Sequence, residues 1–163
     1  MARIVLSDAS PLIVLSRVGG LAWLPALFGC VHVPLPVRRE VLPAQDKAGE
    51  AQLRAALGGP GFVLLKRDWK LPQFPFLGDG EAGCIRAALH MDNASLLLMD
   101  DRAGRVTAVE QGLQVAGTAA IVALAKRHHL IASAGAIFEQ LLHMDFRLSA
   151  EIIRAVLEMA GER

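Results

Sequence analysis

A short apolar segment in the second half of the chain, Leu96 to Met99, ends directly in two adjacent acids, Asp100 and Asp101. A helical pattern begins at Arg102, so the segment predicts a buried strand that opens into a helix. In open α/β sheets, ligands bind in the crevice beyond the carboxyl ends of the strands. Carboxylates at such a position are better placed for chemistry than for packing. The segment therefore predicts an α/β sheet with further functional acids at the ends of its other strands.

Strand-like and helix-like segments alternate along the chain. The predicted strands are 4–7, 30–33, 62–66, 96–99 and 113–116. Helical patterns fill the intervals, including one over 44–57 and one that ends at Asn93, and two more follow at about 134–144 and 149–160. This alternation predicts a three-layer α/β/α fold with a mainly parallel central sheet. At 163 residues the chain fits one domain, which we expect to span residues 1–163.

Composition narrows the class of protein. Hydrophobic residues make up 53% of the chain and charged residues 20%, which indicates a folded globular protein. The formal net charge is +1, so attraction to nucleic acid has to come from local clusters of Lys and Arg. Cys30 and Cys84 lack the spacing of a metal or redox motif and are expected to be buried thiols. No apolar stretch reaches the ~20 residues of a membrane span, so we expect a soluble cytoplasmic protein.

Acids recur at one kind of position in the predicted fold. Asp8 ends the first strand, Glu40 lies in the helix after the second, and Glu81 stands at a helix start. Together with the Asp100-Asp101 pair, they are expected to converge on one crevice, because the ends of neighbouring parallel strands meet there. Clustered carboxylates repel one another unless a cation neutralises them. Hard divalent cations that prefer oxygen ligands, such as Mg²⁺ or Mn²⁺, are the expected partners.

Each acid also has a purely structural interpretation. Asp8 is followed by a serine and a proline, and is in a position to cap a helix. Glu40 also fits a solvated position on a helix surface. The acids of the Asp79-Gly80-Glu81 run are also expected in a first helical turn, where they complement the helix dipole. The Asp100-Asp101 pair is costly at a buried strand end, although the arginines that follow it offer compensation.

Five segments of the chain resemble motifs of PIN domains, most closely those of the DUF3368-type, PIN-like group that resembles VapC-type toxin ribonucleases. The segments are LSDASPLIVLSRVG, VPLPVRREVL around Glu40, LGDGEAGCIRAAL around Glu81, LLLMDDRAGRVTAVEQGLQVAGT and LAKRHHLI. They cover the chain from Leu6 to about Ile131. Each motif is short, but their order, spacing and attachment to strand ends are specific in combination. The resemblance implies a three-layer α/β/α PIN-like fold.

The resemblance also implies an activity, namely metal-dependent hydrolysis of RNA phosphodiester bonds by an endoribonuclease that uses Mg²⁺ or Mn²⁺. The catalytic acids that it implies are Asp8, Glu40, Glu81 and Asp101. Its metal ligands match Asp8, Glu81 and Asp101, with Asp100 as an alternative or additional ligand. We favour Asp101, because it directly precedes an arginine at a helix start. Ser10 matches a small hydroxyl residue that orients water, and Thr118 matches a second hydroxyl position. Glu81 stands where many relatives carry Asp.

Basic and aromatic residues near the acidic segments suggest how RNA is held. The basic residues are Arg38, Arg39, Arg102, Arg105, Lys126 and Arg127. Arg102 and Arg105 follow the acidic pair and are the preferred phosphate contacts, although all six also fit solvated helix faces. Trp69, Phe74 and Phe76 lie in a proline-containing loop and either stack on unpaired bases or pack into the core.

The resemblance extends to partners. VapC-like relatives are typically homodimers held inactive by a small antitoxin protein, which implies the toxin of a toxin–antitoxin pair here. The apolar residues of the helices at about 134–160 are the expected surface for a second copy or for that partner. The alternative is a catalytically inactive PIN-like module that binds RNA or a protein partner.

Overall fold

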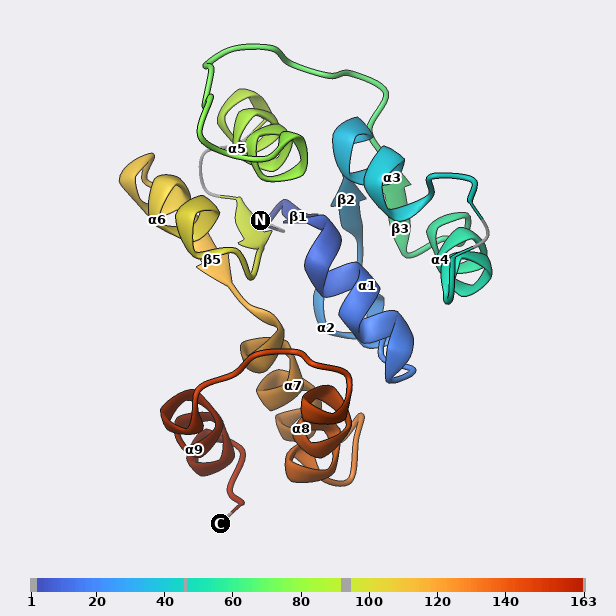
Figure 1. Ribbon diagram of the computed structural model, residues 1–163, viewed down its shortest axis with the longest axis vertical. Coiled ribbons are helices and arrows are strands. Elements are labelled where there is room, and N and C mark those ends of the chain that lie inside the picture. Colours follow the sequence, from blue (N-terminus) through green and yellow to red (C-terminus); the bar gives the residue numbers. More distant parts are fainter. Residues whose placement is uncertain (1–2, 46, 92–94, 163) are drawn as a thin grey trace.

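The computed structural model describes residues 3–45, 47–91 and 95–162. It contains a five-stranded, all-parallel sheet with strand order β3-β2-β1-β4-β5. The strands are β1 (Val5–Ser7), β2 (Val31–Val33), β3 (Phe62–Leu64), β4 (Leu96–Leu98) and β5 (Gln114–Ala116). The helices within the described ranges are α1 (Ala9–Arg17), α2 (Trp23–Phe28), α3 (Leu35–Val41), α4 (Glu50–Leu57), α5 (Asp79–Met91), α6 (Arg102–Glu110), α7 (Thr118–Arg127), α8 (Ala134–His143) and α9 (Ala150–Met159). The predicted three-layer α/β fold with a parallel sheet is confirmed (Figure 1).

The two central strands explain where a site can form. Leu6 of β1 and Leu97 of β4 are fully buried, as expected for strands covered on both faces. β1, β2 and β3 follow one another in one direction across the sheet, and the chain then returns to place β4 on the other side of β1. Such a reversal opens a crevice at the carboxyl ends of the two strands. Ser7 pairs with Leu98 in the register, so Asp8 and the residues after β4 reach this crevice together.

Two glycines bring α5 close to α3. A Cβ at Gly83 would lie 3.0 Å from Cγ of Pro36, and a Cβ at Gly80 would lie 3.7 Å from a methyl group of Val37. A larger residue at Gly83 would therefore force the helices apart. This close packing places Glu40, at the end of α3, opposite the first turn of α5.

The structure differs from the sequence prediction over 44–57, where, of the described residues, Glu50–Leu57 alone are helical. The buried Glu50 carboxylate accepts hydrogen bonds from the backbone amides of Ala44 (2.7 Å) and Lys47 (3.1 Å). Ala44 has a φ of +60°, which a helix does not allow. The side chain thus folds the preceding segment into a loop in place of a helical turn. The helix end predicted at Asn93 lies outside the described residues.

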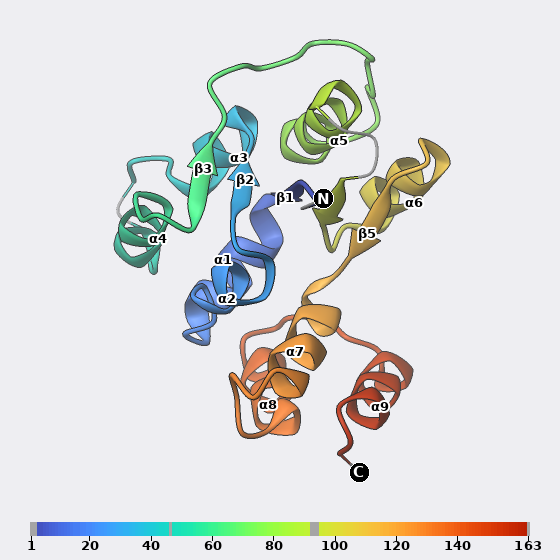
Figure 2. The same ribbon diagram turned by 180° about the vertical axis from the view of Figure 1, so that it is seen from behind.

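The three C-terminal helices, α7, α8 and α9, gather at one end of the molecule in both views (Figures 1 and 2). The Glu162 carboxylate joins the end of α9 to the start of α8 by accepting hydrogen bonds from the amides of Ala134 (2.6 Å) and Gly135 (2.9 Å). The predicted apolar surface is mostly used within the chain itself, because residues such as Phe138 and Leu141 are buried in the core. In the described part of the chain, no helix has both the length and the apolar character needed to cross a membrane.

Candidate active site

Asp8 stands at the centre of the crevice. Its backbone amide donates to the carbonyl of Leu98 (2.9 Å), which extends the pairing of β1 and β4 by one residue and fixes the position of the side chain. Asp8 is the N-cap residue of α1, but its side chain makes no capping hydrogen bond. The residue is only 2% exposed, and its Oδ1 is buried without a hydrogen-bond partner among the described residues. A simple capping role therefore does not explain Asp8, and a buried carboxylate oxygen of this kind is available to a cation or a proton.

Glu40 and Glu81 complete the wall around Asp8. A Cβ at Gly80 would lie 2.9 Å from Asp8 Oδ1 and 2.8 Å from Glu40 Oε2, so the glycine leaves open the space that these two carboxylates face. The cavity has a volume of about 190 Å³ and is lined by Asp8, Ala9, Ser10, Ile13, Val14, Glu40 and Glu81. The structure thus brings together three of the acids predicted from the sequence.

The proximity of these acids changes their protonation. Burial, and then the charge of Glu81, raise the pKa of Asp8 from its ordinary value of 3.8 to about 7, with Glu40 and Asp100 adding to the shift and the Ala9 amide opposing it. Burial and the charges of Glu81 and Asp79 also raise the pKa of Glu40. Such shifts are typical of sites where a cation or a proton balances several carboxylates.

A buried thiol lies within the electrostatic reach of the same acids. Burial, followed by the charges of Asp8, Glu81 and Glu40, raises the pKa of the Cys84 thiol well above its usual range. The thiol therefore stays protonated at neutral pH and is a poor nucleophile. The carboxylates, and not the cysteine, carry the reactive character of the crevice.

Asp100 joins the acidic cluster through a fixed carboxylate. Its Oδ1 accepts a hydrogen bond from the Thr118 amide (2.7 Å). Its Oδ2 accepts from the hydroxyls of Thr118 (2.7 Å) and Ser10 (3.0 Å). The two hydroxyl residues predicted for the site therefore both contact one acid, and they come from the helices that follow β1 and β5. Asp100 is close enough to Asp8 to raise its pKa.

Asp101, which the sequence interpretation favoured over Asp100, has a different environment. It is exposed at the N-cap of α6, where its Oδ2 accepts a hydrogen bond from the Gly104 amide (2.8 Å). This is an ordinary capping contact. The geometry thus places Asp100 with Asp8, Glu40 and Glu81, and gives Asp101 a structural partner. The preference for Asp101 rested on its position before an arginine, which does not reveal where its side chain points.

The two arginines after the acidic pair also differ. A Cβ at Gly117 would lie 2.9 Å from Arg105 Nη1 and 3.1 Å from Asp100 Oδ1, so both groups border the same small space. Arg105 is thus a cation beside the acidic cluster. Arg102 is exposed at the first position of α6, next to the capping residue Asp101.

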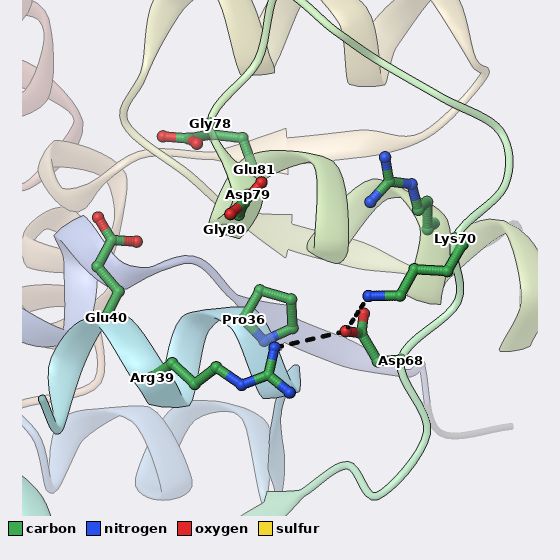
Figure 3. Close-up of a pocket in the computed structure, with 10 residues that line it drawn as sticks. Pro36, Arg39, Glu40, Asp68, Lys70, Gly78, Asp79, Gly80 and Glu81 are labelled. Carbon is green, nitrogen blue, oxygen red and sulfur yellow. Dashed lines mark hydrogen bonds and ion pairs between the residues drawn. The ribbon is translucent and has the colours of Figure 1, made fainter.

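A wider cleft of about 460 Å³ adjoins the acids (Figure 3). It shares Glu40 and Glu81 with the smaller cavity, and its full lining is Pro36, Arg39, Glu40, Asp68, Lys70, Gly78, Asp79, Gly80, Glu81 and Arg86. Sequence reasoning identified Arg39 but missed Asp68, Lys70 and Arg86. The charged run from Arg67 to Lys70 in an otherwise apolar stretch was the only local signal for this cleft.

The donor set fits a hard divalent cation. The site offers carboxylate oxygens, and Asp8 Oδ1 is buried without a partner. Among the described residues, no three acidic, histidine or cysteine side chains are already gathered at metal-binding distance. Mg²⁺ is commonly held by one or two carboxylates together with water and substrate oxygens, so it does not need such a preformed cage.

The pKa shift of Asp8 predicts how stability depends on pH in metal-free protein. A carboxyl group with a higher pKa in the folded state binds more protons folded than unfolded, so the free energy of unfolding decreases as the pH rises from 3.8 to about 7. The loss is expected to reach up to about 4 kcal/mol. Asp8→Asn should remove this loss and make the metal-free protein more stable than the parent at pH 8. Urea unfolding in EDTA between pH 4.5 and pH 8 measures both effects.

Asp145→Asn, at an exposed position, is the matched control and should keep the pH profile of the parent. Mg²⁺ at pH 8 should stabilise the parent more than Asp8→Asn, because a ligand that binds only the folded state adds to its stability. Parallel pH profiles for the parent and Asp8→Asn would show that Asp8 does not carry the shift.

The space beside Gly80 yields a second prediction. Gly80→Ala introduces a methyl group between Asp8 Oδ1 and Glu40 Oε2, while the change favours the helix by about 1 kcal/mol. We expect a folded protein for which the Mg²⁺ concentration that gives half-maximal stabilisation against urea increases by about tenfold or more. Gly58→Ala, where a Cβ meets backbone carbonyls at 3.4 Å and beyond, is the control. An unchanged Mg²⁺ requirement would mean that this space is not used by the cation.

Comparison with known proteins agrees with this geometry. The model of a family described as a PIN domain, DUF3368, matches residues 4–162. No curated protein gives a significant match to the chain. PIN domains have a nuclease-type fold, and in general they are nucleases that use divalent metal ions. The family match spans every strand and helix described above, including the elements that carry the acidic cluster, and the chain therefore belongs to the PIN-domain family.

Proposed function

We propose that this chain is a metal-dependent endoribonuclease that hydrolyses RNA phosphodiester bonds and acts as the toxin of a toxin–antitoxin pair. The observation that carries the proposal is the buried Oδ1 of Asp8, which has no hydrogen-bond partner in the part of the chain that the structure describes. It faces Glu40 across the space beside Gly80 and lies within the electrostatic reach of Glu81 and Asp100. Burying a carboxylate among other acids is energetically costly, and the binding of a cation or of a substrate group offsets that cost.

Asp8, Glu81 and Asp100 are the residues that would hold Mg²⁺ or Mn²⁺. When bound, such an ion would lower the pKa of water and stabilise negative charge on a phosphate. Hydrolysis forms a bond from a water oxygen to phosphorus and breaks the bond to the leaving ribose oxygen, which takes up a proton. Glu40 is exposed at the mouth of the cluster and is placed to accept the proton of the attacking water.

The other residues of the site orient a carboxylate or neutralise negative charge. Ser10 and Thr118 hold the Asp100 carboxylate through three hydrogen bonds, which fixes the direction of its oxygens. Arg105 borders Asp100 and is placed to contact the phosphate whose charge increases during hydrolysis. These contacts come from segments far apart in the sequence, so the site depends on the folded sheet.

The direct test is cleavage of a mixed, end-labelled RNA pool by purified protein with Mg²⁺, with Mn²⁺ and with EDTA. We expect cutting with either metal and none with EDTA. Absence of cutting by metal-loaded, partner-free protein would overturn the enzyme proposal and favour a PIN-like module that only binds RNA or protein.

The toxin role has its own test. Induced expression of the wild-type chain should arrest the growth of the host cells, and expression of Asp8→Asn should not. Exposed apolar side chains such as Leu142 on α8 and Ile152 on α9 support a second copy or an antitoxin as a partner. Light scattering of the purified protein measures its molar mass and so tests whether a second copy binds. Equal growth with both variants would contradict the toxin role without affecting the nuclease proposal.

A further inference from the structure

The wider cleft has a basic side that the acidic chemistry does not use. We call Arg39, Lys70 and Arg86 the basic wall; all three line the cleft of about 460 Å³ that shares Glu40 and Glu81 with the acidic cluster. Arg39 comes from α3, Lys70 from the segment between β3 and α5, and Arg86 from α5. Figures 1 and 2 show this segment arching from β3 to α5. Three separate parts of the chain thus bring positive charge to one cleft.

Two of the wall cations are held by a single acid. Asp68 Oδ2 lies 2.8 Å from Lys70 Nζ and 3.6 Å from Arg39 Nη1. The side chains of Arg39 and Lys70 are 66% and 77% exposed, whereas that of Asp68 is only 13% exposed. Figure 3 shows Asp68 between the two cations, with Glu40 on the other side of the cleft. The cations are therefore accessible to an external anion, and the acid that holds them is recessed.

An external phosphate has clear advantages over Asp68 as a partner of these cations. Ion pairs with solvent-exposed side chains are weak, because water and salt screen them. A phosphate offers several strong acceptor oxygens, and the planar guanidinium of arginine binds such oxygens in pairs. Exchanging Asp68 for a phosphate thus replaces a weak contact by stronger ones.

The third member of the wall has a fixed position. Arg86 Nε donates a hydrogen bond to the carbonyl of Pro72 (2.7 Å), which ties the guanidinium to the β3–α5 segment. His90 Nε2 lies 2.9 Å from the carbonyl of Leu71, and its ring stacks on Trp69 with centroids 5.5 Å apart. The backbone next to Lys70 is thus anchored to α5 at several points. The backbone that carries Lys70 therefore needs little reordering when an anion binds, and only the side chains of Arg39 and Lys70 change partner.

The same segment presents an aromatic ring to solvent. Phe76 is 68% exposed, whereas Phe74 is buried in the core. An exposed aromatic ring two residues before Gly78, which lines the cleft, is suited to stacking on an unpaired base. A basic wall whose Lys70 lies on the same β3–α5 segment as an exposed aromatic ring favours single-stranded nucleic acid over a simple anion.

We propose that the basic wall binds a backbone phosphate of single-stranded RNA next to the scissile bond, and that Asp68 competes with this phosphate for Arg39 and Lys70. The inference rests on the proposed nuclease function for its choice of RNA and deepens it by naming where the flanking strand lies. It differs from a purely structural role for Asp68. In that role, Asp68 would only fix the conformation of the β3–α5 segment. Replacing Asp68 would then weaken RNA binding or leave it unchanged.

The test measures binding of a fluorescent ten-nucleotide single-stranded RNA at several salt concentrations. The wild-type background is assayed in EDTA, and the Asp8→Asn background is assayed in Mg²⁺. Arg39→Ala and Lys70→Ala should each weaken binding by about five- to tenfold and lower the slope of log affinity against log salt by about 0.7, the value for one phosphate contact on a single strand. Asp68→Asn should bind RNA about threefold or more tightly.

Matched variants separate the wall from general charge effects. Arg147→Ala and Asp145→Asn make the same charge changes at exposed positions outside the cleft lining, and should leave the affinity nearly unchanged. In the double-mutant cycle, Arg39→Ala should cost more affinity in the Asp68→Asn background than in the wild type, because Asp68 no longer holds the arginine. Phe76→Ala should weaken binding of RNA with no change in the salt slope.

The outcomes distinguish the two proposals. If wall variants bind RNA as the parent does, or if Asp68→Asn binds no more tightly than the parent, the wall proposal is wrong even where cleavage is observed. If the wall variants lose RNA affinity as expected but no variant or parent cuts RNA, the nuclease proposal fails and the wall remains an RNA-binding site. If neither the wild type in EDTA nor Asp8→Asn in Mg²⁺ binds RNA, the wall proposal is contradicted directly.

Discussion

Replacing Asp8 with asparagine is expected to reduce RNA cleavage by a factor on the order of 10³. The amide keeps the size of the side chain but lacks the negative charge that binds a cation or accepts a proton. Asp8 is the most deeply buried acid of the cluster, and its Oδ1 has no hydrogen-bond partner within residues 3–45, 47–91 and 95–162. The rate of cleavage at saturating Mg²⁺, measured on a defined single-stranded RNA, tests this expectation.

A loss of activity alone does not distinguish a chemical role from a folding defect, but Asp8 permits a sharper test. Its raised pKa means that the ionised side chain destabilises the metal-free fold at neutral pH, so Asp8→Asn is expected to be more stable than the parent while losing activity. A variant that is more stable but inactive indicates a functional residue. The exposed Asp145→Asn control should retain both the activity and the stability of the parent. Retained cleavage in Asp8→Asn would remove Asp8 from the chemistry.

The second large effect on RNA cleavage distinguishes the roles of two neighbouring acids, Asp100 and Asp101. Asp100→Asn is expected to reduce cleavage by about 10²-fold or more, because an amide group cannot accept all the hydrogen bonds that Thr118 and Ser10 donate, and it removes the charge next to Asp8. Asp101→Asn should cleave RNA within about twofold of the parent, because asparagine is as good an N-cap as aspartate. Parallel measurement of cleavage rates for the two variants gives the answer.

The stability of Asp101 variants supplies the control for this pair. Asp101→Ala removes the hydrogen bond to the Gly104 amide and is expected to cost about 1 kcal/mol in the free energy of unfolding, with cleavage preserved. If Asp101→Asn loses activity and Asp100→Asn keeps it, the assignment made from the geometry is reversed. In that case the position of Asp101 before Arg102 would matter more than the contacts of its side chain.

Much of the fold follows from local pattern. The five strands lie where short apolar runs were predicted, and β1, the central strand, is buried at every position because both faces of the sheet are covered there. The acids after β1 and β4 and in α3 and α5 were identified because strand ends in a parallel sheet converge. The described residues 44, 45 and 47–49 were predicted wrongly as helix, since nothing local reveals that the Glu50 side chain accepts hydrogen bonds from backbone amides there. A side chain that competes with backbone hydrogen bonding is visible only in the folded chain.

The sequence by itself determined the class of fold and the positions along the chain where acids are delivered to the crevice, because both depend on periodicity and on strand ends. Tertiary structure decided which acids lie together. Asp100 and Asp101 are adjacent in the chain but their side chains have different partners, and Asp100 is selected by Ser10, which lies 90 residues away in the sequence. The competition of Asp68 for Arg39 and Lys70, and the space kept open by Gly80, likewise depend on packing between segments. The physical reason is that the direction of a side chain is set by the backbone around it and by distant neighbours, which a local pattern does not contain.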